Sequence, residues 1–109
     1  MGKIKHTFLD AAAALGNGNE LLIIQGYDLL HIEVTGTGTN TIAFEAKFID
    51  GGAYYAVQGL ELPALTAATT TSTKGKVYQV DLKGMIAFRC RVSAYTDGSI
   101  TAIGRVVSN

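Results

Sequence analysis

The sequence predicts an all-β fold, an antiparallel β-sandwich of jelly-roll type that forms a single domain. Apolar and polar residues alternate along most of the chain, as they do in strands with one buried face. Glycine-rich turns separate these segments at intervals that suit short antiparallel strands. The chain of 109 residues is long enough for one hydrophobic core and too short for two.

The N-terminal region contains the segment with the best helix propensity, LDAAAAL at residues 9–15. Because so short a helix is unstable alone, we expect an extended or irregular arm over residues 1–18. The sandwich domain is then expected over residues 19–109, with ELLIIQGY at 20–27 as its first well-buried strand. The start of the chain resembles neither a signal peptide nor a membrane span, so we expect the protein to stay where it is made.

Two β-hairpins are predicted. In residues 28–49 the turn TGTGTN supplies residues that tolerate positive φ, and it separates two alternating strands. In residues 85–107 the dipeptide Asp97 and Gly98 is a strong two-residue turn signal. The expected inward side chains are Leu30, Ile32, Val34, Ile42, Phe44, Ala46 and Phe48 in the first hairpin, and Ile86, Phe88, Cys90, Val92 and Ala94 in the second.

Three segments connect these hairpins. DGG at residues 50–52 predicts a turn before AYYAVQGL. PALTAATTTSTKG at residues 63–75 has no clear apolar period, which favours a long surface loop or an edge segment. Residues 77–82 predict a strand with Tyr78, Val80 and Leu82 on its inward face.

The charge balance restricts the classes of partner. Nine basic and nine acidic residues give a formal net charge of zero, so no long-range field attracts nucleic acid or an anionic membrane surface. With 48% hydrophobic and 17% charged residues, charge repulsion does little to oppose self-association. We therefore expect partners that are copies of the chain or other proteins.

The inventory of reactive side chains predicts no enzyme, no metal site and no cofactor. The single cysteine, Cys90, has an inward position where a free thiol acts as a small hydrophobe. The two histidines, His6 and His31, lack partners at metal-site spacing, and His31 with Glu33 is the nearest approach to a ligand pair. No nucleophile, base and orienting group can be assembled from the sequence.

Charged residues at outward strand positions allow two interpretations. In the first, they pair across a solvated face, where each pair contributes about 0.2 to 1 kcal/mol. Alternatively they form an interface with a second subunit, because arginine suits planar contacts with several donors. The interface hypothesis rests on Arg89, Arg91, Arg105, Glu33 and Glu45.

Two adjacent tyrosines after the DGG turn suggest a different role. Aromatic rings beside a turn serve as stacking platforms in carbohydrate-binding sandwiches, which makes Tyr54 and Tyr55 candidate glycan contacts. The alternative is that one ring of the pair belongs to the core and the other is half-exposed.

Residues 11–107 resemble a small family of structural proteins from the virions of tailed bacteriophages and from prophages. The resemblance is carried by GNG, by VTG followed by TIAFE, by DGG before an aromatic residue, by a threonine-rich loop, and by YQVDLKG and RCRVSAYTDGSIT. The sequence departs from the commoner pattern of this family around the DGG turn at residues 50–52, where relatives more often have a serine before the turn and a tryptophan after it. That departure puts a ligand pocket near Tyr54 in doubt.

The resemblance implies a noncatalytic virion protein. We expect a capsid decoration or stabilising protein, with a tail or fibre position as the next choice, made in the bacterial host cytoplasm. Its partners would be copies of itself and other virion proteins, such as the major capsid or tail protein. The alternative function is a carbohydrate-binding module for glycans of the host surface.

Overall fold

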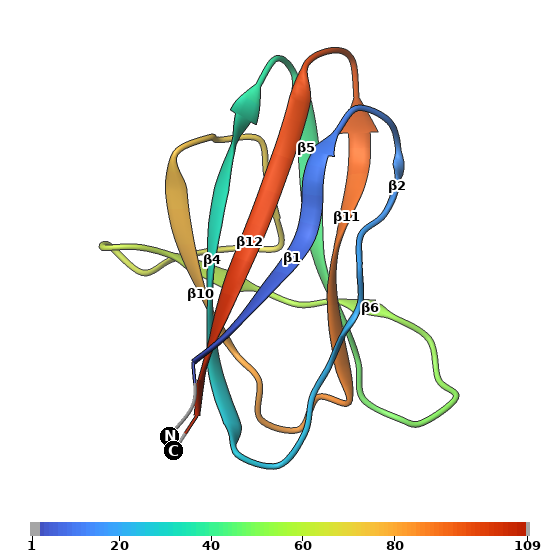
Figure 1. The fold of residues 1–109 in the computed structure, drawn as a ribbon, viewed down its shortest axis with the longest axis vertical. Helices are drawn as coiled ribbons and strands as arrows, with labels where there is room; N and C mark the ends of the chain where they lie inside the picture. Colours follow the sequence, from blue (N-terminus) through green and yellow to red (C-terminus); the bar gives the residue numbers. More distant parts are fainter. Residues whose placement is uncertain (1–2, 109) are drawn as a thin grey trace.

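The computed structural model describes residues 3–108. Within this range the chain forms two antiparallel sheets and no helix, which confirms the predicted all-β sandwich in one domain (Figure 1). None of the described residues therefore belongs to a helix long enough to span a membrane. The strands are β1 (Lys3–Ala12), β2 (Gly16–Asn17), β3 (Leu21–Leu22), β4 (Tyr27–Thr37), β5 (Asn40–Lys47), β6 (Tyr55–Ala56), β7 (Gly59–Glu61), β8 (Thr66–Ala68), β9 (Thr70–Thr71), β10 (Lys76–Asp81), β11 (Ala87–Tyr95) and β12 (Ser99–Ser108).

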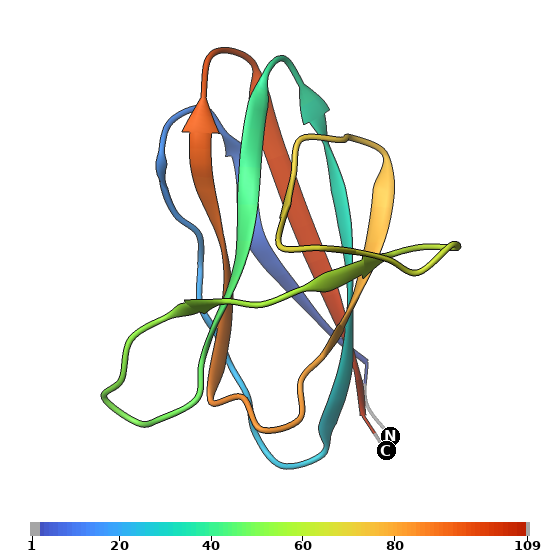
Figure 2. The ribbon, with the colours of Figure 1, turned by 180° about the vertical axis from the view of Figure 1, so that it is seen from behind.

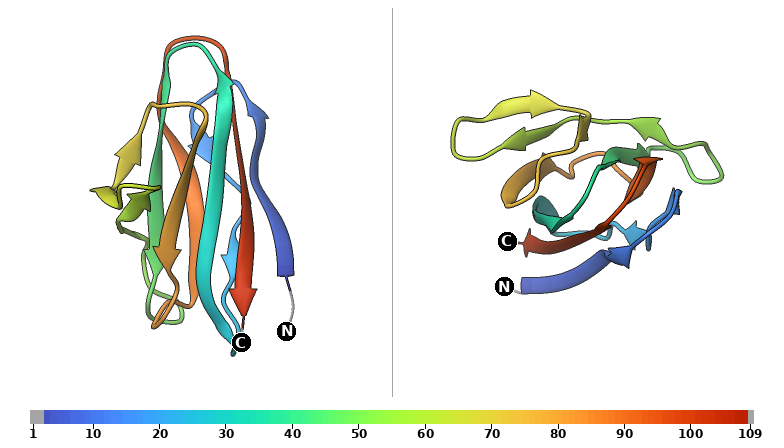
Figure 3. Two further views of the ribbon diagram at one scale, coloured as in Figure 1. Left: turned by 90° about the vertical axis from the view of Figure 1, so that its left-hand side faces the viewer. Right: turned by 90° about the horizontal axis from the view of Figure 1, so that it is seen from above.

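The first sheet has the strand order β1-β12-β4-β10-β7-β8, and the second has the order β2-β11-β5-β6. The short strand β3 also pairs with β11, and β9 pairs with β5. Seen edge-on, β1, β12 and β4 form one layer while β5 and β11 lie in the other (Figure 3). The more specific jelly-roll topology stays a prediction.

The core lies between the sheets and is built from the alternating apolar positions. Every predicted inward residue from Leu30 to Val34 and from Ile42 to Ala46 is buried, as are Tyr78, Val80 and Leu82. Aromatic rings occupy the centre: Phe8 packs edge-on against Phe88 with centroids 5.4 Å apart, and the rings of Phe44 and Tyr78 are 5.3 Å apart.

Two predicted inward positions are exposed. Phe48 follows the last residue of β5 and retains 44% exposure, because the chain has left the sheet before it. Ala94 is exposed because the register of β11 against β5 shifts between Val92 and Ala94, which ends the simple alternation.

The two predicted hairpins are instead arches that cross from one sheet to the other. β4 pairs with β12 and β10, whereas β5 pairs with β11, so neither β4–β5 nor β11–β12 forms a hydrogen-bonded pair. The two arch tips lie side by side at one end of the molecule (Figures 1 and 2). There the carboxylate of Asp97 accepts a hydrogen bond from the Thr39 amide at 2.7 Å. The side-chain amide of Asn40 donates to the carbonyls of Thr37 and Asp97, both at 3.0 Å.

The N-terminal segment is a strand of the first sheet, so the expectation of a separate arm over residues 1–18 is wrong for the residues described. β1 pairs with β12 from Lys3 opposite Val107 to Ala12 opposite Ile100. A register shift between Thr7 and Leu9 allows the consecutive residues Phe8 and Leu9 both to be buried. This bulge removes the period-two signal from the sequence. Residues 1–2 lie outside the described range.

The segment ELLIIQGY is not a well-buried strand. Leu21 and Leu22 form the two-residue strand β3, in which Leu22 retains 62% exposure, and Tyr27 already belongs to β4. The threonine-rich segment at 63–75, in contrast, is the predicted edge segment. Its strand β8 pairs with β7 in the first sheet, and its strand β9 then pairs with β5 in the second.

Candidate functional site

The five residues of the interface hypothesis do not form one patch. Arg89 and Arg91 on β11 lie with Glu45 of β5 on the outer face of the second sheet. Arg105 on β12 and Glu33 on β4 lie on the outer face of the first sheet, on the other side of the core. Outward positions of a sandwich point in two opposite directions, so one interface does not include all five residues, and their role in assembly stays a prediction.

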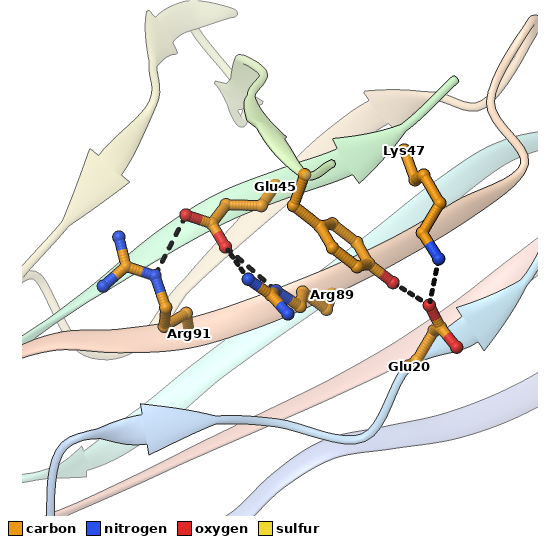
Figure 4. Close-up of polar contacts among 6 residues, drawn as sticks. Glu20, Glu45, Lys47, Arg89 and Arg91 are labelled. Atoms are coloured by element: carbon orange, nitrogen blue, oxygen red, sulfur yellow. Dashed lines mark hydrogen bonds and ion pairs between the residues drawn. The ribbon is translucent and has the colours of Figure 1, made fainter. Parts of the chain in front are cut away.

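On the second sheet, Glu45 is held between two arginines (Figure 4). Its Oε1 atom accepts a hydrogen bond from Nε of Arg89 at 2.9 Å, and Nη2 of the same guanidinium forms an ion pair with this oxygen, also at 2.9 Å. Its Oε2 atom accepts from Nε of Arg91, also at 2.9 Å. Both carboxylate oxygens of Glu45 therefore bind arginines of the same chain, and Glu45 is only 9% exposed. This arrangement matches the interpretation of charges that pair across neighbouring strands.

Tyr54 extends this network across the sheet. The Arg89 guanidinium lies 3.8 Å from the centre of the Tyr54 ring, and the Tyr54 hydroxyl donates a hydrogen bond to the Glu20 carboxylate. Lys47 lies 3.8 Å from the same Glu20 oxygen. Burial raises the pKa of Tyr54 well above its usual range, and the hydrogen bond to Glu20 and its charge add to the effect. We call Glu20, Glu45, Lys47, Tyr54, Arg89 and Arg91 the Glu45 network.

The two candidate glycan tyrosines have different surroundings. Tyr54 has a ring face against Arg89 and its hydroxyl bonded to Glu20, so it does not form a free platform. Tyr55 is 65% exposed and borders a small hollow of about 110 Å³ with Phe48 and Ile49. Tyr54 is therefore half-buried and engaged within the chain, whereas Tyr55 is the more exposed of the two candidate glycan contacts.

An apolar surface at one end of the sandwich was not predicted from the sequence. It consists of large side chains that are 44–72% exposed: Leu22, Ile24, Phe48, Ile49 and Tyr55. Backbone hydrogen bonds from Ile23 to Ile86 and from Ile86 to Lys47 bring the segments that carry them together. We call this surface the apolar end. The runs LLII and FI carried the signal, because adjacent apolar residues in a regular strand cannot all face the core.

The cysteine and the two histidines have structural surroundings. Cys90 is completely buried, and burial raises the pKa of its thiol. His6 contacts the backbone carbonyl of Asn19 at 3.1 Å, and Nε2 of His31 lies 3.2 Å from the Gln79 side-chain oxygen. Residues 3–108 contain no group of three or more His, Cys, Asp or Glu side chains placed to hold a metal ion.

Comparison with known proteins identifies the family. The XepA family model matches residues 2–106, almost the whole sequence. The chain belongs to the XepA family. Among solved structures, the SPBc2 prophage-derived protein YomS is similar with a TM-score of 0.88 and 23% identity, over 98% of this chain and 94% of that one. No curated protein sequence matches the chain.

The PBSX exported protein XepA has the same fold, with a TM-score of 0.90 and 24% identity over 98% of this chain. The match covers 38% of the XepA structure, so this chain spans well under half of that protein's length. Both similar structures share the β-sandwich fold of this chain, and the first of them, YomS, is described as prophage-derived.

Proposed function

We propose that this XepA-family chain is a noncatalytic structural protein of a phage particle, and that it docks on neighbouring proteins through the apolar end. A capsid decoration or stabilising role is the leading choice, followed by a tail or fibre position. The partners would be copies of the chain or other virion proteins such as the major capsid or tail protein. The family membership and the prophage origin of the similar structure YomS support this role.

The observation that carries the proposal is the exposure of the apolar end. Phe48 and Ile49 retain 44% and 72% of their surface in the isolated chain, next to Tyr55 at 65%. Exposed apolar surfaces of this kind are typical of protein–protein contacts, because their burial removes apolar area from water.

The test is fractionation of an induced lysogen that carries a tagged copy of the chain. Phage particles purified by density gradient are expected to contain the wild-type protein and to lose the variant Phe48→Ser/Ile49→Ser. The matched control is Leu15→Ser, because Leu15 is 64% exposed but lies in the connection between β1 and β2, away from the apolar end. Purified particles without the wild-type protein would overturn the virion role, and equal retention of both variants would overturn docking through the apolar end.

The same fractionation tests a second candidate, action outside the cell. It is favoured by the similarity to XepA, a protein described as exported. Protein in the medium before lysis, with none in the particles, would support it and contradict the virion role. The glycan-binding alternative now rests on Tyr55 alone, and a glycan array that compares wild type with Tyr55→Ala tests it directly.

A further inference from the structure

The outer face of the first sheet carries a row of polar side chains that includes two cations, Lys5 and Arg105. Lys5 of β1 pairs with Arg105 of β12, Arg105 pairs with His31 of β4, and His31 pairs with Gln79 of β10. Residues directly opposite one another in antiparallel strands have Cβ atoms about 5 Å apart. The side chains of Lys5, Arg105 and His31 therefore project side by side from three neighbouring strands.

The two positive charges of this row, on Lys5 and Arg105, have no ion-pair partner among residues 3–108. Both side chains are exposed. Glu33 pairs with Ile103, two residues along the strands from the Arg105 and His31 pair, and it too forms no ion pair within residues 3–108. Like charges directly opposite in a sheet are destabilising. The second sheet differs, because there Glu45 is placed between Arg89 and Arg91.

The row borders a hollow of about 450 Å³ on this face. Lys5, Arg105 and His31 line it together with Glu33, and the apolar side chains of Val77 and Ile103 complete its wall. A ligand in this hollow would therefore meet cationic groups and an aliphatic surface at once. This combination suits an organic carboxylate rather than a small inorganic anion.

We propose that this hollow binds an acidic segment of another polypeptide. Arg105 would hold a carboxylate through two parallel N–H donors, and Lys5 would supply a second positive charge. The row from β1 to β10 spans three strand spacings, about 14 Å, which matches about four residues of an extended peptide. Glu33 and the zero net charge of the chain oppose a densely charged polyanion such as nucleic acid. This site lies on a sheet face and does not depend on the proposed virion role.

The test is binding of a labelled, N-acetylated hexaglutamate peptide to the full chain, measured by fluorescence anisotropy, with hexaglutamine as the neutral probe. Wild type is expected to bind hexaglutamate only, and Lys5→Gln/Arg105→Gln is expected to bind it about tenfold more weakly, because two charge-assisted contacts are lost. Glu33→Gln is expected to bind more tightly, because it removes a carboxylate that repels the ligand. The control Lys76→Gln/Lys83→Gln removes two other exposed lysines and is expected to bind as wild type does.

Three outcomes would overturn the proposal. The first is the absence of hexaglutamate binding by wild type at millimolar peptide. The second is equal weakening by the Lys5/Arg105 and Lys76/Lys83 pairs, which would show a nonspecific charge effect. The third is binding of anionic phospholipid vesicles through Lys5 and Arg105 without binding of the peptide, which would assign the row to a membrane surface.

Discussion

Both Nε and Nη2 of Arg89 lie 2.9 Å from the same carboxylate oxygen of Glu45, across the neighbouring strands β11 and β5. The other carboxylate oxygen of Glu45 accepts from Arg91. Arg89 and Arg91 are therefore neither free to bind a ligand nor simply exposed to solvent. They join β11 to β5 on the outer side of the second sheet, where Tyr54 covers Arg89.

Glu45→Gln is expected to lower the free energy of unfolding by about 1–3 kcal/mol, because two partly buried arginines lose their counter-charge. The matched control is Glu33→Gln, which changes an exposed glutamate without an ion pair in residues 3–108. This control is expected to stay within about 0.5 kcal/mol of wild type. Urea unfolding followed by circular dichroism measures both variants. Equal midpoints for the two would show that the Glu45 contacts add nothing to stability.

Reversal of both arginines, Arg89→Glu/Arg91→Glu, is expected to disrupt the folded chain itself. The double variant places three carboxylates on adjacent strand positions around Glu45, which is nearly buried. A loss of assembly in this variant would therefore report unfolding and not the loss of an interface. Circular dichroism and size exclusion of the purified variant measure the effect, and Arg105→Glu on the other sheet serves as the control that keeps its fold. A native-like spectrum and elution volume for the double variant would contradict the expectation.

The alternation in the sequence determined which side chains face the core, but not which strands pair. Leu30, Ile32 and Val34 are buried as predicted, yet β4 pairs with β12 and not with β5. A hairpin within one sheet and an arch between two sheets bury the same alternating positions, so a single sequence does not distinguish them. The strand β1 escaped prediction because its bulge buries Phe8 and Leu9 in succession.

The surfaces could be predicted only in part for the same reason. Outward positions were assigned correctly for Arg89 and Arg105, but their separation onto opposite faces follows from the sheet to which each strand belongs. The row of Lys5, Arg105 and His31 forms only because β1 pairs with β12, and the sequence did not indicate that β1 is a strand. The position of the Tyr54 ring over Arg89 depends on the path of the turn at residues 48–54, which the sequence did not predict.

The contact of the two arch tips predicts a difference between two glycine substitutions. Gly98 and Gly84 have nearly the same backbone angle, φ of 79° and 84°, so an alanine is similarly strained at either position. A Cβ at Gly98 would lie 2.2 Å from the Thr37 carbonyl oxygen, whereas a Cβ at Gly84 would meet nothing within 4 Å. Gly98→Ala is expected to lower the melting temperature by more than Gly84→Ala does. Equal decreases in melting temperature for the two variants, measured by differential scanning fluorimetry, would show that the contact between the arch tips does not contribute to stability.

The buried phenol of Tyr78 predicts a loss of stability at alkaline pH. Its oxygen lies 2.6 Å from the Thr71 hydroxyl, and it donates to the Glu61 carboxylate at 3.3 Å. Burial is the main reason that the pKa of Tyr78 is raised above its usual value of about 10, and Glu61 raises it further. The unfolded chain therefore releases this proton first. As the pH rises above about 10, the unfolded state is stabilised and the free energy of unfolding falls.

Tyr78→Phe isolates this contribution. At neutral pH the variant is expected to lose about 1 kcal/mol, because the phenol contacts to Thr71 and Glu61 are removed. Above about pH 10 its free energy of unfolding is expected to fall less steeply than that of wild type, since one proton no longer distinguishes the two states. The remaining slope belongs in part to Cys90, whose pKa burial also raises. Urea unfolding at pH 8, 10 and 11 measures the difference, and parallel declines of the two proteins would exclude Tyr78 as a source of alkaline instability.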